Sequence, residues 1–493
     1  MPSATSTHPA SIPITRSAAI RQAYLTGPPI AVYLIAAIVA ASFTFDLMRK
    51  PIQVSDSLQE LIDVQQSPSL WATFVAHSPR GPFLRPLKQV QTKLLFDIAA
   101  GHYWLVFRAF HALLIAAAVF LFIRALQVQS WPDAAAAVFA LTVFTGLHTF
   151  RGLVREAFPI NLYLESVLGC LIVLSLAQSR PSVWTDIAAA AAFIVATLTV
   201  ESGVLVWVVV VAAWASGLRG VTWRGVSAVT LLLVMYLGSR FALSIATPGL
   251  DVGRDSGFGT RMLETGELAR RFGDNPYWFY LYNLGTSILS VLFSDPDRGV
   301  FHTVRTWLEG EMPARLYLPV VTSAMTTALI AWVWLARWRG RGPKLLPSHA
   351  RLLDIFAVVL LANGVVSYAY PKHEIISVAG AFYAFAAYVA VRYSIDLAGR
   401  IATLRQRALC ALVAVLACAW AFRSVGVHHM IQVQAFRERL EWARLDPERI
   451  AERGYPSDAR ARALTARLRR DALDLRLPNP NELPAWADDW WGE

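Results

Sequence analysis

Three acidic residues lie at helical spacing in a polar segment between two long apolar runs. Asp56, Glu60 and Asp63 follow one another at intervals of four and three residues within the segment 51–104. A helix over 56–65 would therefore place their carboxylates on one face. A carboxylate near a membrane surface can act as a general base, or bind a divalent cation that neutralises a phosphate. We predict Asp56 and Glu60 as catalytic residues, with a solvated helix face as the simpler alternative.

Two arginines follow in the stretch Ser78–Leu87, which prolines and a glycine restrict to a rigid, kinked path. Arg80 and Arg85 are thereby held on one short extended segment. Guanidinium groups match phosphate oxygens with two parallel hydrogen bonds. The stretch therefore predicts a site for an anionic headgroup, although ordinary lipid headgroups satisfy the same geometry.

Other ionisable residues gather near the ends of apolar runs, on the side of the membrane that carries the acidic segment. Such residues usually face the protein interior or a water-filled cavity, and the alternative is snorkelling or ion pairing between helices. Those that we predict to bind substrate, together with Arg80 and Arg85, are His111, Arg151, Arg155, Glu156, Glu201, Lys372 and His373. The sequence contains no zinc spacing, glycine-rich phosphate loop or nucleophile elbow. The sequence therefore predicts no particular protein-bound metal or cofactor, and it gives no evidence for ATP-driven transport.

The composition indicates a multi-pass membrane protein. Of the 493 residues, 56% are hydrophobic and only 16% are charged, and the mean hydropathy is +0.45. The net charge of +11 is explained by basic cytoplasmic loops, so nucleic acid is not a predicted partner. The three cysteines all lie in apolar runs, which argues against a disulfide framework.

The apolar runs predict an all-α protein with about eleven transmembrane helices, because about 20 apolar residues cross a bilayer core. The predicted spans are 28–48, 105–126, 133–150, 160–178, 183–200, 203–218, 222–246, 317–337, 352–370, 376–395 and 408–424. The aromatic segment 275–294 is predicted to be interfacial or re-entrant. Glu201 lies at a polar hairpin tip between two short spans.

Charge bias between the loops sets the predicted orientation. Most loop arginines fall on one side, which is then cytoplasmic. This gives a cytoplasmic segment 1–27, a transmembrane domain 28–424 with large outer loops 49–104 and 247–316, and an extracytoplasmic, helical tail 425–493. The Arg- and Ala-rich composition hints at a bacterial inner membrane, in which case the tail is periplasmic.

This layout resembles the GT-C class of integral membrane glycosyltransferases, which take sugars from polyprenyl-phosphate carriers. The resemblance covers most of the chain. The segments that carry it are VSDSLQEL, RGPFLRPL through HYWLVFRAFHALL, GLHTFRGLVREAF, TLTVESGVLV and YPKHEIISVAGAFYAFAAY. Many members show two adjacent acidic residues after the first span, where this chain has Asp56-Ser57.

The resemblance implies roles for particular residues. Asp56 becomes the base that deprotonates or binds the acceptor, and Arg80, Arg85 and Lys372 become ligands of the donor phosphate. The predicted function is transfer of a hexose or pentose from a polyprenyl-phosphate donor to an acceptor glycan, lipid or protein on the outer side of the membrane. The alternatives are a lipid or solute transporter or flippase, and a non-catalytic cell-envelope assembly factor.

Overall fold

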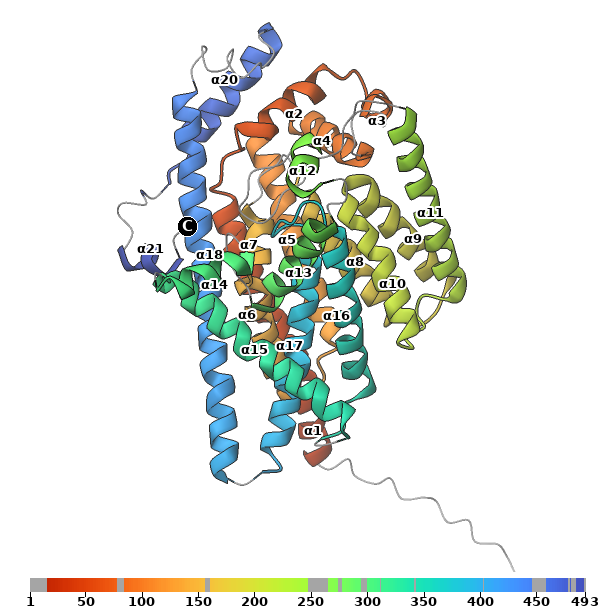
Figure 1. Cartoon of the computed structure of the whole chain (residues 1–493), viewed down its shortest axis with the longest axis vertical. Helices are drawn as coiled ribbons and strands as arrows, with labels where there is room; N and C mark the ends of the chain where they lie inside the picture. The colour runs from red at the N-terminus through yellow and green to blue at the C-terminus, as the bar shows by residue number, and fades with distance from the viewer. Residues whose placement is uncertain are drawn as a thin grey trace, which may run out of the picture.

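The computed structural model describes residues 16–77, 84–155, 160–246, 265–273, 277–293, 299–310, 312–340, 343–401, 403–445, 458–477, 479 and 485–491. Within these ranges every regular element is a helix (Figure 1), which confirms the predicted all-α class.

Long apolar helices form the body of the molecule. Seven are long and apolar enough to cross a membrane, and an eighth crossing is made by α6 and α7 together if that pair, bent by 57°, is one broken span. Their bounds are α1 (Arg16–Leu47), α5 (Tyr103–Leu126), α6 (Trp131–Gly146), α7 (His148–Arg155), α11 (Trp223–Ala246), α15 (Ala314–Trp338), α16 (Pro347–Val366), α17 (Ser377–Ala398) and α18 (Thr403–Arg444).

Three further apolar helices are shorter than a normal span. They are α8 (Leu162–Ala177), α9 (Val183–Thr199) and α10 (Leu205–Ala215), and the one-turn 3-10 helix η1 (Glu201–Val204) joins the last two. The predicted total of about eleven spans requires all three to cross the bilayer, and it stays a prediction.

The remaining helices are α2 (Ser55–Gln66), α3 (Leu70–His77), α4 (Pro86–Ala99), α12 (Thr265–Phe272), α13 (Tyr277–Phe293), α14 (Gly299–Leu308), α20 (Ala459–Asp474) and α21 (Ala485–Trp491). Of these, α13 packs against α15, α16 and α17 of the body. We call the end of the molecule that carries α2, α3, α4 and α20 the loop end; it is at the top of Figure 1. The turn between α17 and α18 lies at the opposite end.

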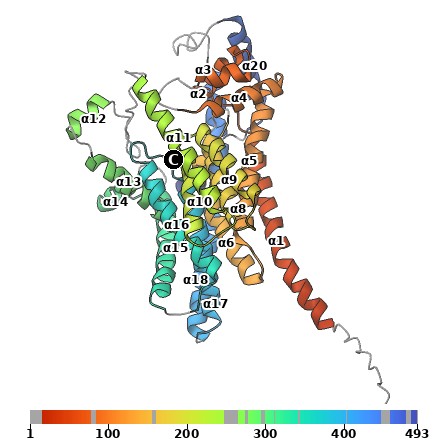
Figure 2. The same cartoon turned by 90° about the vertical axis from the view of Figure 1, so that its right-hand side faces the viewer.

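The core is centred on α17. Alanine, phenylalanine and tyrosine alternate along it, and 89% of its apolar window is buried inside the protein, against 17–50% for the other candidate spans. Helices α6, α15, α16 and α18 all pack against it, as Figure 2 shows from the side. Lipid-facing spans retain one exposed face, so α17 is the central helix of the bundle.

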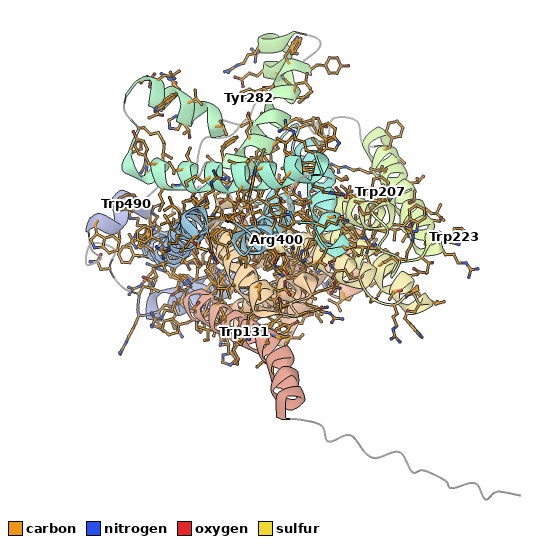
Figure 3. The ribbon with its side chains drawn as sticks, turned by 90° about the horizontal axis from the view of Figure 1, so that it is seen from below. Trp131, Trp207, Trp223, Tyr282, Arg400 and Trp490 are labelled. Atoms are coloured by element: carbon orange, nitrogen blue, oxygen red, sulfur yellow. The ribbon has the colours of Figure 1, made fainter. Side chains whose placement is uncertain are left out.

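Tryptophan side chains mark the rim of the bundle. Figure 3 looks from the α17–α18 turn and places Trp131, Trp223 and Trp490 at the periphery, with Arg400 near the centre. These tryptophans are 40–63% exposed. Indole rings favour the headgroup level of a bilayer, so this distribution fits an integral membrane protein.

Helix α18 runs through the predicted boundary at 424/425 without a break. Its 42 residues span about 63 Å at 1.5 Å per residue, roughly twice the thickness of a bilayer core. Gly426 is the only glycine after residue 424 in this helix, and it stays helical. The second half of α18 must therefore project beyond the bilayer, where it packs against α20 and α21.

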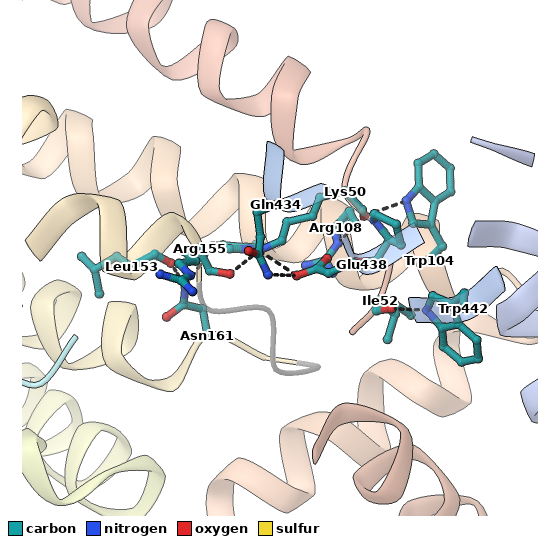
Figure 4. A network of polar contacts seen from close by, with 12 residues as sticks. Lys50, Ile52, Trp104, Arg108, Leu153, Arg155, Asn161, Gln434, Glu438 and Trp442 are labelled. Carbon is teal, nitrogen blue, oxygen red and sulfur yellow. Dashed lines mark hydrogen bonds and ion pairs between the residues drawn. The ribbon is translucent and has the colours of Figure 1, made fainter. Parts of the chain in front are cut away.

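A buried polar network ties this projecting half to the first two long helices (Figure 4). Lys50 is fully buried and lies 3.4 Å from the Glu438 carboxylate of α18. Arg108 of α5 donates to the carbonyl oxygen of Lys50 at 2.8 Å, and the Trp442 indole donates to that of Ile52 at 2.6 Å. Lys50 also donates to the carbonyl oxygen of Arg155. These contacts fix the chain where it leaves α1 and enters the loop end.

The Lys50–Glu438 pair gives a stability prediction. Replacing Lys50 with Met leaves a buried carboxylate without its cation, which typically costs about 3–5 kcal/mol. We expect K50M to lower the thermal unfolding midpoint of the purified protein in detergent. The double variant K50M/E438Q removes both charges while keeping an acceptor for Gln434, so most of the loss should be recovered. A double variant no more stable than K50M would contradict this role for the pair.

Candidate functional site

Helix α4 carries polar side chains that meet acidic residues on three different elements. Arg85 donates through Nε to both carboxylate oxygens of Glu201 in η1, at 2.9 and 3.0 Å. Lys88 pairs with Glu60 of α2, and Gln91 donates to Glu165 of α8 at 2.9 Å. The spacing of three residues puts all three donors on one face. These contacts fasten α4 over the ends of α8 and α9.

The Arg85–Glu201 pair joins two residues that the sequence predicted to bind substrate. Burial disfavours the guanidinium charge, but the Glu201 carboxylate outweighs it and raises the pKa of Arg85 above its ordinary value. The Arg85 guanidinium group therefore stays ionised. Because its guanidinium group is directed at the Glu201 carboxylate, Arg85 positions α4.

Of the three acidic residues that meet the α4 donors, Glu165 is the most deeply buried, with 8% exposure. Its Oε2 accepts from Gln91 and from the Thr199 hydroxyl, the latter at 3.2 Å. Its Oε1 is buried without a hydrogen-bond partner in the part of the chain that the structure describes. This oxygen is a position where a further donor would be stabilised.

A separate pocket of about 60 Å³ is lined by three arginines. Arg151 comes from α7, Arg315 from the start of α15 and Arg423 from the middle of α18. Each arginine shares a helix face with another lining residue three positions away. Arg151 is paired in this way with His148, Arg315 with Leu318 and Arg423 with Gly426. The described residues that line the pocket include no aspartate or glutamate. Such a concentration of guanidinium groups suits an anion.

Arg423 is the most deeply held of the three, at 6% exposure. Its Nη1 donates to the hydroxyls of Thr322 at 2.7 Å and Ser323 at 2.9 Å on α15. Its guanidinium group also lies 3.9 Å over the ring of Trp420. These contacts fix the position of the guanidinium group beside the pocket.

Close helix packing makes this geometry possible. A Cβ atom on Gly146 would lie 2.9 Å from the Trp420 carbonyl oxygen of α18, so only glycine permits α6 and α18 to cross here. The Thr145 and Ser424 hydroxyls hydrogen-bond across the crossing at 2.8 Å. The chain bends immediately afterwards, and α7 presents His148 and Arg151 to the pocket.

The turn before α17 flanks the arginine pocket. The His373 ring meets His148 edge to face with centroids 4.6 Å apart, and Lys372 lies over the Tyr370 ring at 4.8 Å. Arg155 is exposed at the end of α7. His148, which lines the pocket with Arg151, thus links the pocket to His373. The substrate-binding role of Arg151 and His373 stays a prediction.

The other predicted residues lie apart from this pocket. Asp56 is exposed on α2, whereas Glu60 on the same helix is paired with Lys88. His111 is buried in α5, and its Nε2 lies 3.0 Å from the Asn161 side-chain amide nitrogen. Arg80 and Glu156 fall outside the described residues. Across the described ranges, no group of three or more His, Cys, Asp or Glu side chains is placed to hold a metal ion.

An apolar groove of about 470 Å³ lies further along two of the same helices. Its walls come from α6, α17 and α18, including Phe139, Val391 and Val413, and Cys410 and Cys418 also line it. Along α6 the groove residues end at Thr142, one turn before Gly146 of the arginine pocket. The groove therefore offers an apolar surface within the span region.

Comparison with known proteins gives one structural match. No protein-family model and no curated protein matches the chain. The fold is similar to that in the crystal structure of ArnT from Cupriavidus metallidurans bound to undecaprenyl phosphate, with a TM-score of 0.42 and 13% identity over 90% of this chain and 74% of that chain.

Sequence reasoning did not select Arg315, Arg423, Lys88 or Lys50. Arg315 and Arg423 each stand at the edge of a predicted span, which is the signal that could have drawn attention to them. Their convergence depends on how α15 and α18 cross, and no spacing in the sequence encodes that.

The fastening of α4 can be measured by hydrogen exchange. We expect E201Q to speed amide exchange in α4 by about tenfold, since the charge-assisted contact with Arg85 is lost. The charge-swapped R85E/E201R variant should restore most of the protection. A matched control is D97N, because Asp97 pairs with Lys93 inside α4 itself. Equal exchange rates in E201Q and D97N would show that the Arg85–Glu201 contact does not hold α4 in place.

Proposed function

We propose that this chain is a membrane glycosyltransferase that transfers a sugar from a polyprenyl-phosphate donor to an acceptor at the loop end. The observation that carries the proposal is the pocket lined by Arg151, Arg315 and Arg423. It lies where α6, α15 and α18 reach the loop-end side of the bundle, the level at which a lipid phosphate meets protein. The resemblance of the sequence to GT-C enzymes supports the same reaction class.

The proposed reaction needs one base and one site for developing negative charge. The acceptor hydroxyl oxygen bonds to C1 of the sugar, and the bond between C1 and the carrier phosphate oxygen breaks. The hydroxyl proton passes to the base, and the electron pair of the broken bond stays on the departing polyprenyl phosphate. Fixed cations near that phosphate stabilise the transition state more than the donor, which accelerates the transfer.

In this scheme the three arginines hold the carrier phosphate. Arg423 is fixed by Thr322 and Ser323 before any ligand arrives, so little reorganisation accompanies the reaction. Low dielectric at the edge of the bilayer strengthens each contact. The apolar groove between α6, α17 and α18 suits the hydrocarbon part of the carrier. The loop end is then the outer side, with the N-terminus cytoplasmic, in a bacterial inner membrane.

Asp56 is the proposed base. Its carboxylate is exposed at the loop end, whereas Glu60 is held by Lys88 and serves to position α4. Among the described residues Asp56 has no salt-bridge partner. An exposed carboxylate can be reached by an acceptor arriving from the aqueous side. Because Asp56 lies apart from the arginine pocket, this role requires α2 to approach the pocket when donor and acceptor bind.

The arginine assignment predicts a large loss of activity. We expect R151Q and R315Q each to reduce transfer of radiolabelled sugar from a polyprenyl-phosphate donor by about 100-fold, as loss of one transition-state donor does elsewhere. R405Q is the matched control, because Arg405 is exposed at the other end of α18. Transfer at the wild-type rate in R151Q and R315Q would rule out phosphate binding in this pocket.

The base assignment predicts a separation of binding from transfer. We expect D56N to lower the transfer rate by about 100-fold or more, while the affinity for undecaprenyl phosphate stays unchanged. D63N serves as the control on the same helix, since Asp63 accepts a hydrogen bond from Gln59 at 2.8 Å. Full activity in D56N would remove Asp56 from the mechanism.

A further inference from the structure

The C-terminal helix α21 supplies two tryptophans to the arginine pocket. Trp490 and Trp491 line it together with the three arginines, although they come from the last residues of a long extramembrane tail. α21 packs against both α15 and α18. The pocket therefore has a cationic wall made by spans and an aromatic wall made by the tail.

Trp491 anchors this helix. Its indole ring lies on Gly426 of α18, where a Cβ atom would be 2.4 Å from the indole Cδ1. The ring centroid is 4.6 Å from that of Phe422 and 5.7 Å from that of His429. Glycine at 426 is thus needed for the indole to reach the helix backbone. Trp491 packs against these three residues of α18 and thereby fixes the position of α21.

Trp490 differs from its neighbour because it stays 40% exposed while lining the pocket. The planes of the Trp490 and Phe422 rings are nearly perpendicular, at 88°, and their centroids are 6.2 Å apart. This edge-to-face contact favours one orientation of the Trp490 ring. The pocket thus combines a fixed, partly open indole with guanidinium groups.

We infer that Trp490 is a sugar-binding residue, which stacks on the apolar face of the pyranose or furanose ring whose phosphate the arginines hold. This inference rests on the proposed function. A sugar ring exposes C–H groups on its faces and hydroxyls at its edge, so a flat aromatic surface covers the former and leaves the latter for polar contacts. The partly exposed Trp490 ring, and not the Trp491 indole held against Gly426, is the surface that a sugar ring can reach.

Two lipids distinguish this role from phosphate binding. Affinities of wild type and variants in nanodiscs are measured for undecaprenyl phosphate and for the same lipid bearing glucose, galactose or arabinose. W490L should weaken the preferred sugar-bearing lipid by about tenfold, the size of one good aromatic contact, and leave undecaprenyl phosphate unchanged. W490F keeps a flat ring and should recover most of the affinity. R315Q should weaken both lipids.

The controls separate stacking from anchoring. W71L removes an exposed tryptophan of α3 that does not line the pocket, and it should leave both affinities unchanged. W491L removes the indole that anchors α21 and should reproduce the loss in W490L without altering an arginine. The inference is overturned if W490L leaves both affinities unchanged or weakens both equally. It is also overturned if the wild-type protein binds the sugar-bearing lipid no more tightly than undecaprenyl phosphate. If wild type binds neither lipid saturably, the proposed function itself fails.

Discussion

The structure depends on placing buried cations where apolar helices end. Lys50, Arg108 and Arg423 are each no more than 6% exposed, and an isolated charge in such a position is prohibitively costly. Each is held differently: Lys50 by Glu438 and a carbonyl oxygen, Arg108 by carbonyl oxygens of the chain leaving α1, and Arg423 by hydroxyls of α15. These solutions fix where α1, α5, α15 and α18 lie relative to one another. Helix packing and the candidate site are consequences of the same requirement.

Two groups of charged residues result, and they serve different purposes. Around α4 each donor meets an acid, so the charges are satisfied internally and hold the helix over the ends of α8 and α9. In the pocket between α7, α15 and α18 the described lining is cationic and aromatic. Three guanidinium groups around one pocket suit a ligand of opposite charge. The phosphate is therefore assigned to the arginine pocket, whereas Arg85 is directed at Glu201.

Much of the fold was predictable from sequence. The helix over 56–65 is confirmed as α2, and the predicted helical character of the tail is confirmed by α20, because both have regular apolar spacing. Apolar runs of span length also located the long helices. The unbroken course of α18 past residue 424 was not anticipated, since the chain turns polar there, and polarity marks the end of the bilayer rather than the end of a helix.

The candidate site was only partly predictable. Arg151 was selected and lines the pocket, and His373 was selected and contacts the lining residue His148. Arg315, Arg423 and Trp490 were not, because they come together only through the crossing of α15 and α18 and the return of the tail to the bundle. Glu201 and Arg85 were selected for charge, yet they pair with one another. Residue type identifies charges that need an explanation, but only the packing shows which of them satisfy each other.

The most direct test of the proposed phosphate site is a cryo-electron microscopy structure of the wild-type protein in nanodiscs with undecaprenyl phosphate. We expect phosphate density within hydrogen-bonding distance of Arg151, Arg315 and Arg423, beside Trp490. Phosphate bound instead at Arg85, or no density in the arginine pocket at saturating lipid, would contradict it.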